Sequence, residues 1–306
     1  MFQQELKNYV AQNPDLVKMK EVAPGMFVLK YTKKVFYKGL WNKYLEECRG
    51  TIVDKDFNVI QRPFTKIYNY GVEKQAPVLP DDTEITAFEK INGFMVAVTW
   101  HDEKLLVSTT GSVESPFVDM AMEYIDQVED GMETMCEFYN GYTWLFECCH
   151  PNDPHIIQQE PGLYLLGCRR KSWDPESLVP LDECATLGYV EAFNTYRGVN
   201  VVKAPKMFHT TLGELKKMVK SVRHEGFVFY TASGVAAKIK SPYYLMAKWV
   251  ARNPNTDKLM DLKNDIKERI EEEFYPLVDK IRENIEEYTA LDEQSRLAWV
   301  RKQLGE

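Results

Sequence analysis

The stretch Phe88-Glu89-Lys90-Ile91-Asn92-Gly93 decides how this sequence is interpreted, because it places a lysine between two apolar runs and a glycine three residues after that lysine. The flanking runs, 84–88 and 93–100, have the composition of buried β-strands. A lysine followed at this spacing by glycine occurs by chance in many chains. The pattern therefore gains meaning only from what surrounds it.

Around this stretch the middle of the chain predicts short strands rich in Val, Ile, Phe, Tyr and Leu. They lie at 84–88, 93–100, 104–109, 143–149, 163–169, 226–231 and 235–240. The run 104–109 follows 93–100 after three residues, and 235–240 follows 226–231 across Ser233-Gly234. Both spacings are typical of hairpins, so the strands are expected to be antiparallel.

Helices are predicted between and after the strands. Ser115 is a candidate N-cap before Pro116, with an apolar stripe at Phe117, Met120, Tyr124 and Val128. Thr211 and Glu214 have capping-box spacing ahead of Leu212, Leu215, Met218 and Val219, and another helix follows Ser241-Pro242. From Thr256 the chain becomes charged and amphipathic, with Leu262, Ile266, Ile270 and Phe274 in steps of four and a break at Pro276.

These elements predict an α+β fold of packed antiparallel sheets flanked by helices. The expected domains are residues 1–252 and a small all-helical domain, residues 253–306, with the boundary near Asn253-Pro254-Asn255.

The charge is distributed unevenly along the 306 residues. The net charge of −8 argues against a nucleic-acid partner at first sight. Residues 30–74, however, carry 10 Lys/Arg and 5 Asp/Glu, and residues 201–252 carry 10 and 2, whereas residues 75–200 carry 6 and 22. Two basic segments inside an acidic chain indicate either a shared anionic ligand or a solvated lysine-rich surface.

Cysteine spacing and hydropathy indicate the cellular compartment in which the protein is expected to act. The six cysteines show no CxxC spacing, and the first ten residues contain no apolar run typical of a secretory signal. We therefore expect a reducing, cytoplasmic setting. The longest apolar run, 93–100, is too short to span a bilayer. Cys148-Cys149-His150 with His155 is a weak metal candidate, because adjacent residues of a strand point to opposite faces.

Further motifs follow in a fixed order. Glu147 ends an apolar run, Glu225 precedes Gly226-Phe227-Val228, and Lys238-Ile239-Lys240 comes thirteen residues after Glu225. With Lys90 and Gly93, this series resembles the motifs of the covalent nucleotidyltransferases, which include ATP-dependent ligases and mRNA capping enzymes.

Upstream motifs narrow the resemblance. Glu47-Cys48-Arg49-Gly50, the run Arg62-Pro63-Phe64-Thr65-Lys66-Ile67-Tyr68-Asn69, the stretch 108–112, and Phe146-Glu147 ahead of Pro151 are together similar to the phage RNA ligase 1 family, the single-strand RNA ligases. The similarity extends from about Tyr31 to Tyr244.

The resemblance implies a role for each matching residue. Lys90 would attack the α-phosphate of ATP to form a lysyl-adenylate, and Glu147 would hold the ribose. Arg49, Lys66, Lys238 and Lys240 would contact phosphates, and Glu225 would orient the lysine and bind metal. The nucleotide-binding set is completed by Tyr31, Glu89 and Gly93, the last allowing close backbone approach, and Tyr244 matches a tyrosine important in the family.

Elementary chemistry makes its own prediction for the lysine. A protonated amine is a poor nucleophile, and neighbouring cations favour the neutral form. If Arg49, Lys66, Lys238 and Lys240 surround Lys90, its pKa is expected to be lowered. The same cations would neutralise a triphosphate and the departing pyrophosphate.

Two departures from the family pattern stand out. Asn92 occupies the position where the family has an aspartate, so a carboxylate that could orient the lysine or a metal is absent, although the amide can still donate and accept hydrogen bonds. The chain also ends in about fifty helical residues instead of the family's long C-terminal segment, so the tRNA preference linked to that segment is not carried over.

The resulting hypothesis is an ATP-dependent RNA ligase that joins a 5′-phosphate end to a 3′-hydroxyl end. The expected cofactors are ATP and Mg²⁺, with Mn²⁺ as an alternative, and the expected substrate is single-stranded or loop RNA bound by a monomer without membrane contact. Alternatives are a DNA ligase or capping-type nucleotidyltransferase, which would continue into an OB-fold, and a catalytically silent nucleic-acid end-binding protein.

Overall fold

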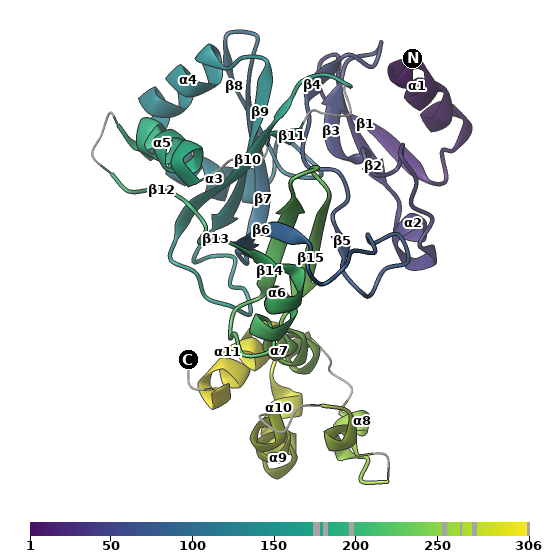
Figure 1. Ribbon diagram of the computed structural model, residues 1–306, viewed down its shortest axis with the longest axis vertical. Coiled ribbons are helices and arrows are strands. Elements are labelled where there is room, and N and C mark those ends of the chain that lie inside the picture. The colour runs from purple at the N-terminus through teal and green to yellow at the C-terminus, as the bar shows by residue number, and fades with distance from the viewer. Residues whose placement is uncertain are drawn as a thin grey trace.

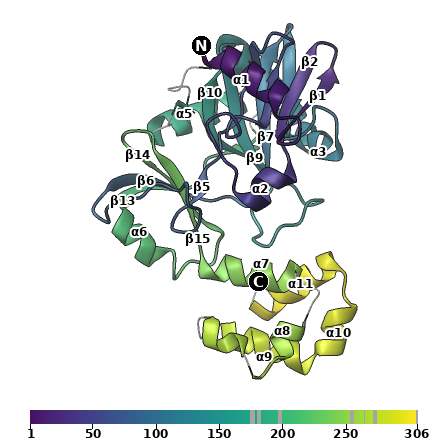
Figure 2. The same cartoon turned by 90° about the vertical axis from the view of Figure 1, so that its right-hand side faces the viewer.

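The computed structural model describes residues 1–173, 178–179, 183–195, 199–252, 256–263, 265–270 and 274–304. The predicted boundary at Asn253-Pro254-Asn255 lies outside these residues. Three sheets with their helices form the larger body, and a group of helices lies beyond one end of it, as Figures 1 and 2 show.

The first sheet is built by the N-terminal part of the chain, which the strand predictions did not cover. β1 (Val17–Ala23), β2 (Met26–Tyr31), β3 (Arg49–Val53) and β4 (Val59–Gln61) follow one another in order and pair antiparallel. α1 (Phe2–Gln12) and α2 (Lys33–Lys38) belong to the same region. Leu6, Val17, Leu29 and Val53 are among the residues that form its core.

The second sheet has the order β13-β6-β14-β15-β5 and contains the strand that precedes Lys90 and the strand that carries Lys238 and Lys240. Its strands are β5 (Tyr68–Asn69), β6 (Glu84–Glu89), β13 (Met207–Thr211), β14 (Gly226–Thr231) and β15 (Ala236–Lys240). All pairs are antiparallel except β15 with β5. The register places Lys240 opposite Gly226 and Lys238 opposite Val228, so both lysines lie near the end of β6 that leads to Lys90.

The third sheet has the order β11-β10-β9-β7-β8, with β12 paired parallel to β10. Its strands are β7 (Phe94–His101), β8 (Lys104–Ser108), β9 (Tyr142–Cys149), β10 (Gly162–Arg170), β11 (Leu178–Val179) and β12 (Val202–Lys203). α3 (Pro116–Ile125), the 3₁₀ turn at Asp126–Val128, α4 (Glu129–Phe138) and α5 (Glu183–Asn194) pack on it. The antiparallel strands predicted in the middle of the chain are confirmed within one or two residues.

The predicted caps are confirmed, and so is Val128 of the predicted apolar stripe, which is buried, but on α3 itself the buried stripe is displaced by one residue. The Ser115 hydroxyl accepts from the Val118 amide and starts α3, and Thr211 caps α6 (Leu212–Met218) in the same way. The side chains that α3 buries are Val118, Ala121 and Ile125, while Phe117 is 43% exposed. Phe117 instead covers Phe94 at the edge of the sheet, with ring centroids 5.0 Å apart.

The C-terminal helices are α7 (Pro242–Arg252), α8 (Asp257–Met260), the 3₁₀ turn Ile266–Arg269, α9 (Tyr275–Glu283), α10 (Ile285–Ala290) and α11 (Glu293–Leu304). The predicted steps of four from Leu262 to Phe274 do not form one helix, since Leu262 is 73% exposed and follows a four-residue helix. α7 shares its buried cluster with α9, α10 and α11, and Ile156 and Ile157 of the larger body belong to the same cluster. Within the described ranges no helix combines the length and the hydropathy that crossing a membrane requires.

Candidate active site

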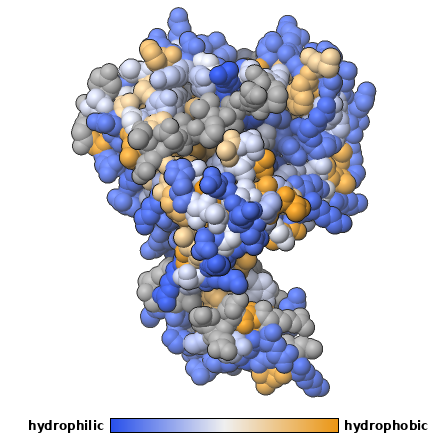
Figure 3. All heavy atoms as spheres, viewed as in Figure 1, coloured by the Kyte–Doolittle hydropathy of each residue, from blue (hydrophilic) through white to orange (hydrophobic). Residues whose placement is uncertain are grey.

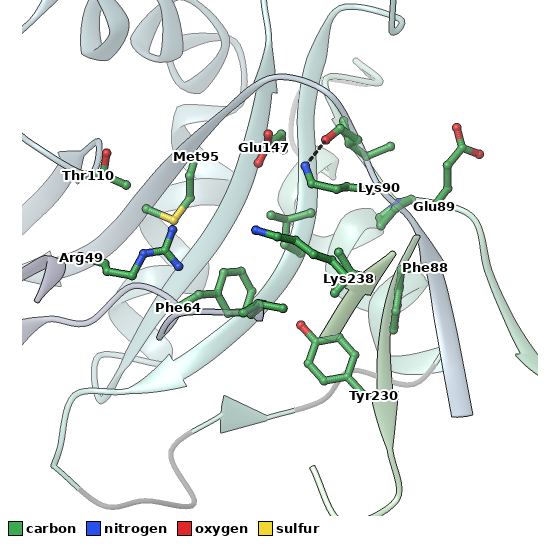
Figure 4. A pocket seen from close by; sticks show the side chains of 15 residues that line it. Arg49, Phe64, Phe88, Glu89, Lys90, Met95, Thr110, Glu147, Tyr230 and Lys238 are labelled. Carbon is green, nitrogen blue, oxygen red and sulfur yellow. Dashed lines mark hydrogen bonds between the residues drawn. The ribbon is translucent and has the colours of Figure 1, made fainter. Parts of the chain in front are cut away.

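Lys90 lies in the turn that follows β6, beside the first residue of β14. Its backbone N–H donates to the Gly226 carbonyl at 2.9 Å, which fixes the turn to that strand. Its ammonium group donates to Glu225 Oε2 at 3.0 Å and to its neighbour's carbonyl, Ile91 O, at 3.2 Å. The latter bond is dashed in Figure 4. Lys90 is thus held both at its backbone N–H and at its ammonium group, and the ammonium group faces a pocket.

Glu225 is the centre of the charged cluster. It is 2% exposed, and its two oxygens accept from Lys90 at 3.0 Å, Lys240 at 2.9 Å and the Asn92 amide at 2.8 Å. Burial by itself would raise the pKa of Glu225, but Lys90 and Lys240 lower it, and the net shift is downward. Glu225 is therefore a buried anion that positions two lysines and an amide.

The prediction that neighbouring cations lower the pKa of Lys90 is wrong for this state of the protein. Burial lowers that pKa, but Glu147 and Glu225 raise it by more, so Lys90 is held in its protonated form. After burial, the charge of Glu147 is the largest influence on this pKa, and Glu225 adds to it through its charge and its direct hydrogen bond.

The cation cluster acts instead on Lys238. Burial, followed by the charges of Lys66, Arg49 and other nearby lysines, lowers the pKa of Lys238 to about 7. No hydrogen bond or ion pair of its ammonium group is found among the described residues. In Figure 4 the side chains of Lys238, Arg49 and Lys90 point toward the same space.

That space is a pocket with a charged side and an apolar side. Of the predicted residues, Arg49, Glu89, Lys90, Glu147 and Lys238 line it. The sequence did not identify its apolar lining, which includes Phe64, Ile67, Phe88, Met95, Val228 and Tyr230. Strand alternation could have indicated Val228 and Tyr230, which share a face of β14. An apolar slot beside cations is suited to a nucleotide, which has a planar base and an anionic phosphate chain.

Arg49 presents an unused donor. Its terminal Nη1 donates to the Thr65 carbonyl at 3.1 Å, whereas its Nε is buried without a hydrogen-bond partner. A buried N–H without an acceptor costs free energy, and a phosphate oxygen would satisfy it. This observation fits a phosphate-bearing ligand in the pocket.

Lys66 and Tyr31 lie on the flank of the pocket rather than in its lining. Lys66 Nζ pairs with Glu73 Oε1 at 2.6 Å and lies 5.1 Å from the centroids of both the Trp41 and Tyr68 rings. The Tyr31 ring packs edge-on against Trp41 at 4.7 Å. The two residues act in opposite directions: Tyr31 opposes the lowering of the Arg49 pKa by burial, whereas Lys66 lowers the pKa of Lys238.

Glycine is required at position 93 for a reason that the sequence did not indicate. A Cβ there would lie 2.2 Å from the Cys148 carbonyl oxygen, so the close approach is to β9. The Gly93 amide donates to Glu147 Oε1 at 3.1 Å, while burial, only partly opposed by Lys90, raises the pKa of Glu147. Gly93 thus connects the turn after Lys90 to the strand that carries Glu147.

Gly93→Ala is expected to lower the free energy of unfolding by about 1–3 kcal/mol, because the added methyl group must displace strand backbone. Urea denaturation measures this change. Gly141→Ala is the matched control, since nothing lies within 4 Å of a Cβ at that position. Equal stability of the two variants would contradict the assignment.

Asn92 links this cluster to the C-terminal helices. Its Nδ2 donates to Glu225, and its Oδ1 accepts from the Ile157 amide at 3.2 Å. The neighbouring Ile156 carbonyl accepts from Arg301 Nε of α11 at 3.1 Å. Tyr244 of α7 lies under Lys240, whose Nζ is 4.8 Å from the ring centroid. The helices therefore support the groups that hold Lys90, and Tyr244 is both a core residue and a neighbour of the site.

The described residues do not form a metal site of their own. Both Glu225 oxygens are already engaged by cations and an amide, and no group of three or more His, Cys, Asp or Glu side chains in the described ranges could hold a metal ion. The geometry therefore gives no support to Glu225 as a metal ligand in the absence of nucleotide.

The sheets and helices together have the nucleotidyltransferase fold. An archaeal ATP-dependent RNA ligase superposes with a TM-score of 0.55 at 15% identity, covering 99% of this chain and 77% of that one. A putative ATP-dependent DNA ligase from Aquifex aeolicus superposes with a TM-score of 0.50 at 16% identity, covering 99% and 76%. At such identities the likeness concerns the fold alone.

The sequence comparison identifies the family. The RNA ligase family matches residues 47–249, about two thirds of the chain, and the chain belongs to this family, as the resemblance to the phage RNA ligase 1 proteins predicted. The RNA ligase of Rhodothermus phage RM378 is 25% identical, with 70% of this chain and 63% of that protein covered. RNA ligase 1 of bacteriophage TS2126 is 28% identical, with 40% of this chain and 34% of that protein covered. The matches thus span less than two thirds of these relatives' length.

Proposed function

We propose that this protein is an ATP-dependent RNA ligase that joins a 5′-phosphate end to a 3′-hydroxyl end through a lysyl-adenylate and an adenylylated RNA. The observation that carries the proposal is Lys90, fixed by Glu225 at the edge of a pocket whose other cationic groups are Arg49 and Lys238. An oriented amine beside unsatisfied cationic donors is the arrangement that nucleophilic attack on a phosphate ester requires.

In the first step the Lys90 nitrogen would attack the α-phosphorus of ATP. A nitrogen–phosphorus bond forms, the bond from that phosphorus to the bridging oxygen breaks, and pyrophosphate leaves. Lys90 must first lose a proton to the solvent, because the lowered pKa of Glu225 makes that carboxylate a poor proton acceptor. AMP then passes to the RNA 5′-phosphate, and the 3′-hydroxyl displaces it to form the phosphodiester.

Arg49 and Lys238 would bind the phosphates, and the apolar lining would receive the base. Arg49 gains an acceptor for its buried Nε, and Lys238 gains a counter-charge that it lacks within the described part of the protein. Glu147 is placed near Lys90 by its bond from Gly93 and would hold the ribose hydroxyls. Lys240 acts on Glu225 rather than on the pocket.

A divalent cation, Mg²⁺ or Mn²⁺, would arrive with the triphosphate, because Mg²⁺ is commonly held by substrate phosphates and one or two carboxylates. Bound there, it would supply charge neutralisation of the leaving pyrophosphate. We do not propose that this cation is bound by the protein alone, because both carboxylate oxygens of Glu225 already accept hydrogen bonds from lysine side chains.

The proposal includes the wider setting expected from the sequence. Residues 1–252 would be the nucleotidyltransferase domain and residues 253–306 the helical domain, with α7 packed on the latter. The protein would act as a monomer on single-stranded or loop RNA in a reducing, cytoplasmic compartment. The five cysteines with described side chains are free and buried, which supports that compartment.

End joining tests the proposal directly. A 5′-phosphorylated, single-stranded RNA incubated with the protein, ATP and Mg²⁺ should give a circular product whose phosphate resists phosphatase. The same oligonucleotide made of DNA tests the DNA ligase alternative, and GTP in place of ATP tests the capping alternative. Absence of joined RNA, with or without product from DNA, would overturn the proposal.

ATP binding is expected to depend on the protonation of Lys238. Its pKa of about 7 means that the ammonium form is present below pH 7 and is lost as the pH rises through that value. Above pH 7 the bound triphosphate must draw a proton onto Lys238, so ATP affinity should fall by up to about tenfold per pH unit.

Calorimetry in buffers of different ionisation enthalpy measures this proton uptake between pH 7.5 and 9. Lys238→Arg is the matched variant, because arginine stays protonated throughout that range and should abolish both the uptake and the pH dependence. Identical uptake by the two proteins would contradict the assignment to Lys238.

A further inference from the structure

The segment from Lys30 to Lys43 carries exposed aromatic and basic side chains that the site described above does not use. It contains five lysines and no acidic residue. α2, within it, leaves Phe36 55% and Tyr37 77% exposed, with the two ring centroids 5.5 Å apart. Large aromatic side chains adjacent on a surface usually mark an interaction site.

Cations flank these rings. Lys33 and Lys38, at the two ends of α2, are exposed, and no carboxylate of the described residues pairs with either. Lys34 and Lys43 differ, because they pair with Asp15 at 2.5 Å and Glu5 at 2.9 Å. The unneutralised charge therefore lies beside Phe36 and Tyr37.

The loop after β5 extends the same surface. Gln75 Nε2 donates to the Gly39 carbonyl at 3.0 Å and joins the loop to the end of α2. Val72, Lys74 and Val78 of this loop are exposed. Figure 1 places the loop beside α2, and Figure 3 shows hydrophobic atoms among hydrophilic ones on that flank. We call Lys33, Phe36, Tyr37, Lys38 and Lys74 the α2 surface.

Packed side chains connect the α2 surface to the nucleotide pocket. Trp41, three residues beyond α2, contacts the Tyr31 ring at 4.7 Å and lies 5.1 Å from Lys66 Nζ. Tyr31 acts on Arg49, which lines the pocket. An RNA strand whose 5′ end lay at Arg49 could therefore run past Trp41 to α2.

We propose that the α2 surface binds single-stranded RNA next to its reacting end, with bases stacked on Phe36 and Tyr37 and phosphates held by Lys33, Lys38 and Lys74. The proposal rests on the proposed function. Stacking on aromatic rings together with cations along the backbone is how proteins bind single strands without sequence preference. A second copy of the chain is a poorer occupant, since a symmetric contact through α2 would oppose lysine to lysine.

The test compares two variants with wild type. Phe36→Ala/Tyr37→Ala should weaken the binding of a fluorescent single-stranded RNA about tenfold or more, as measured by anisotropy. Lys33→Ala/Lys38→Ala should weaken binding and reduce its salt dependence by up to two counterions. Phe138→Ala and Lys104→Ala, which alter exposed residues elsewhere, serve as matched controls.

Lysyl-adenylate formation from ATP separates this proposal from the proposed function. It should be unchanged in both variants, because neither alters a pocket residue. RNA affinity equal to wild type in the aromatic variant would overturn the α2 proposal, as would a wild-type dimer in solution that this variant dissolves. Failure of the wild-type protein to form lysyl-adenylate would instead overturn the proposed function.

Discussion

Lys90→Ala is expected to carry no covalent label after incubation with α-labelled ATP and Mg²⁺, while the wild-type protein is labelled. Lys90 lines the pocket and is held by two hydrogen bonds. Its backbone N–H donates to the Gly226 carbonyl, and its ammonium group donates to Glu225. Removal of a nucleophile deletes the covalent route rather than slowing it, so the loss should exceed a thousandfold.

The control for this variant is Lys206→Ala, which removes an exposed lysine 3.8 Å from Glu89 near the same site. It should be labelled like wild type. ATP binding, measured by calorimetry, should survive in Lys90→Ala, because Arg49, Lys238 and the apolar lining remain. Label that persists in Lys90→Ala, or that comes from GTP alone, would refute the proposed chemistry.

Glu225→Ala is expected to slow lysyl-adenylate formation by about a hundredfold to a thousandfold, comparable to the loss of one preorganised electrostatic contact in other enzymes. Three donors, from Lys90, Lys240 and Asn92, lose their common acceptor. The Lys90 amine then has no hydrogen-bonded carboxylate to hold its direction. Single-turnover kinetics with labelled ATP measures the rate.

Glu225→Gln separates charge from shape, since it keeps one acceptor oxygen. It removes an anion that raises the pKa of Lys90, so the amine should become neutral at lower pH and the pH–rate profile should shift toward acid. Glu214→Ala, an exposed carboxylate on α6, is the control, and thermal melts identify any variant that fails to fold. A Glu225→Ala rate within twofold of wild type would show that Glu225 does not orient Lys90.

Much of the fold follows from local patterns. The strands from β6 to β10 and the hairpin of β14 and β15 were predicted because each is a short apolar run between turn residues. The first sheet was not, because strands such as β1 mix apolar residues with Lys18, Lys20 and Glu21 without a clear alternation: Val17 is its one buried position. The helix predicted from Leu262 to Phe274 was wrong, since spacing alone cannot say whether a neighbour covers the stripe.

Many of the candidate site residues were also predicted from the sequence, because their motifs follow one another in the order found in the family. The apolar lining was not, because Phe64, Met95 and Tyr230 come from a loop and two different sheets and resemble ordinary core residues. Their roles with a bound nucleotide stay predictions.

The sequence by itself determined which chemical groups are available: a lysine proposed as the nucleophile, two glutamates and a set of cations, in the order of the RNA ligase family. Only the tertiary structure decided which charges face one another. The register of β14 and β15 brings Glu225 between Lys90 and Lys240, so Lys90 is protonated, whereas burial and nearby cations lower the pKa of Lys238. Electrostatic energies depend on separation and burial, and the folded sheets alone fix both.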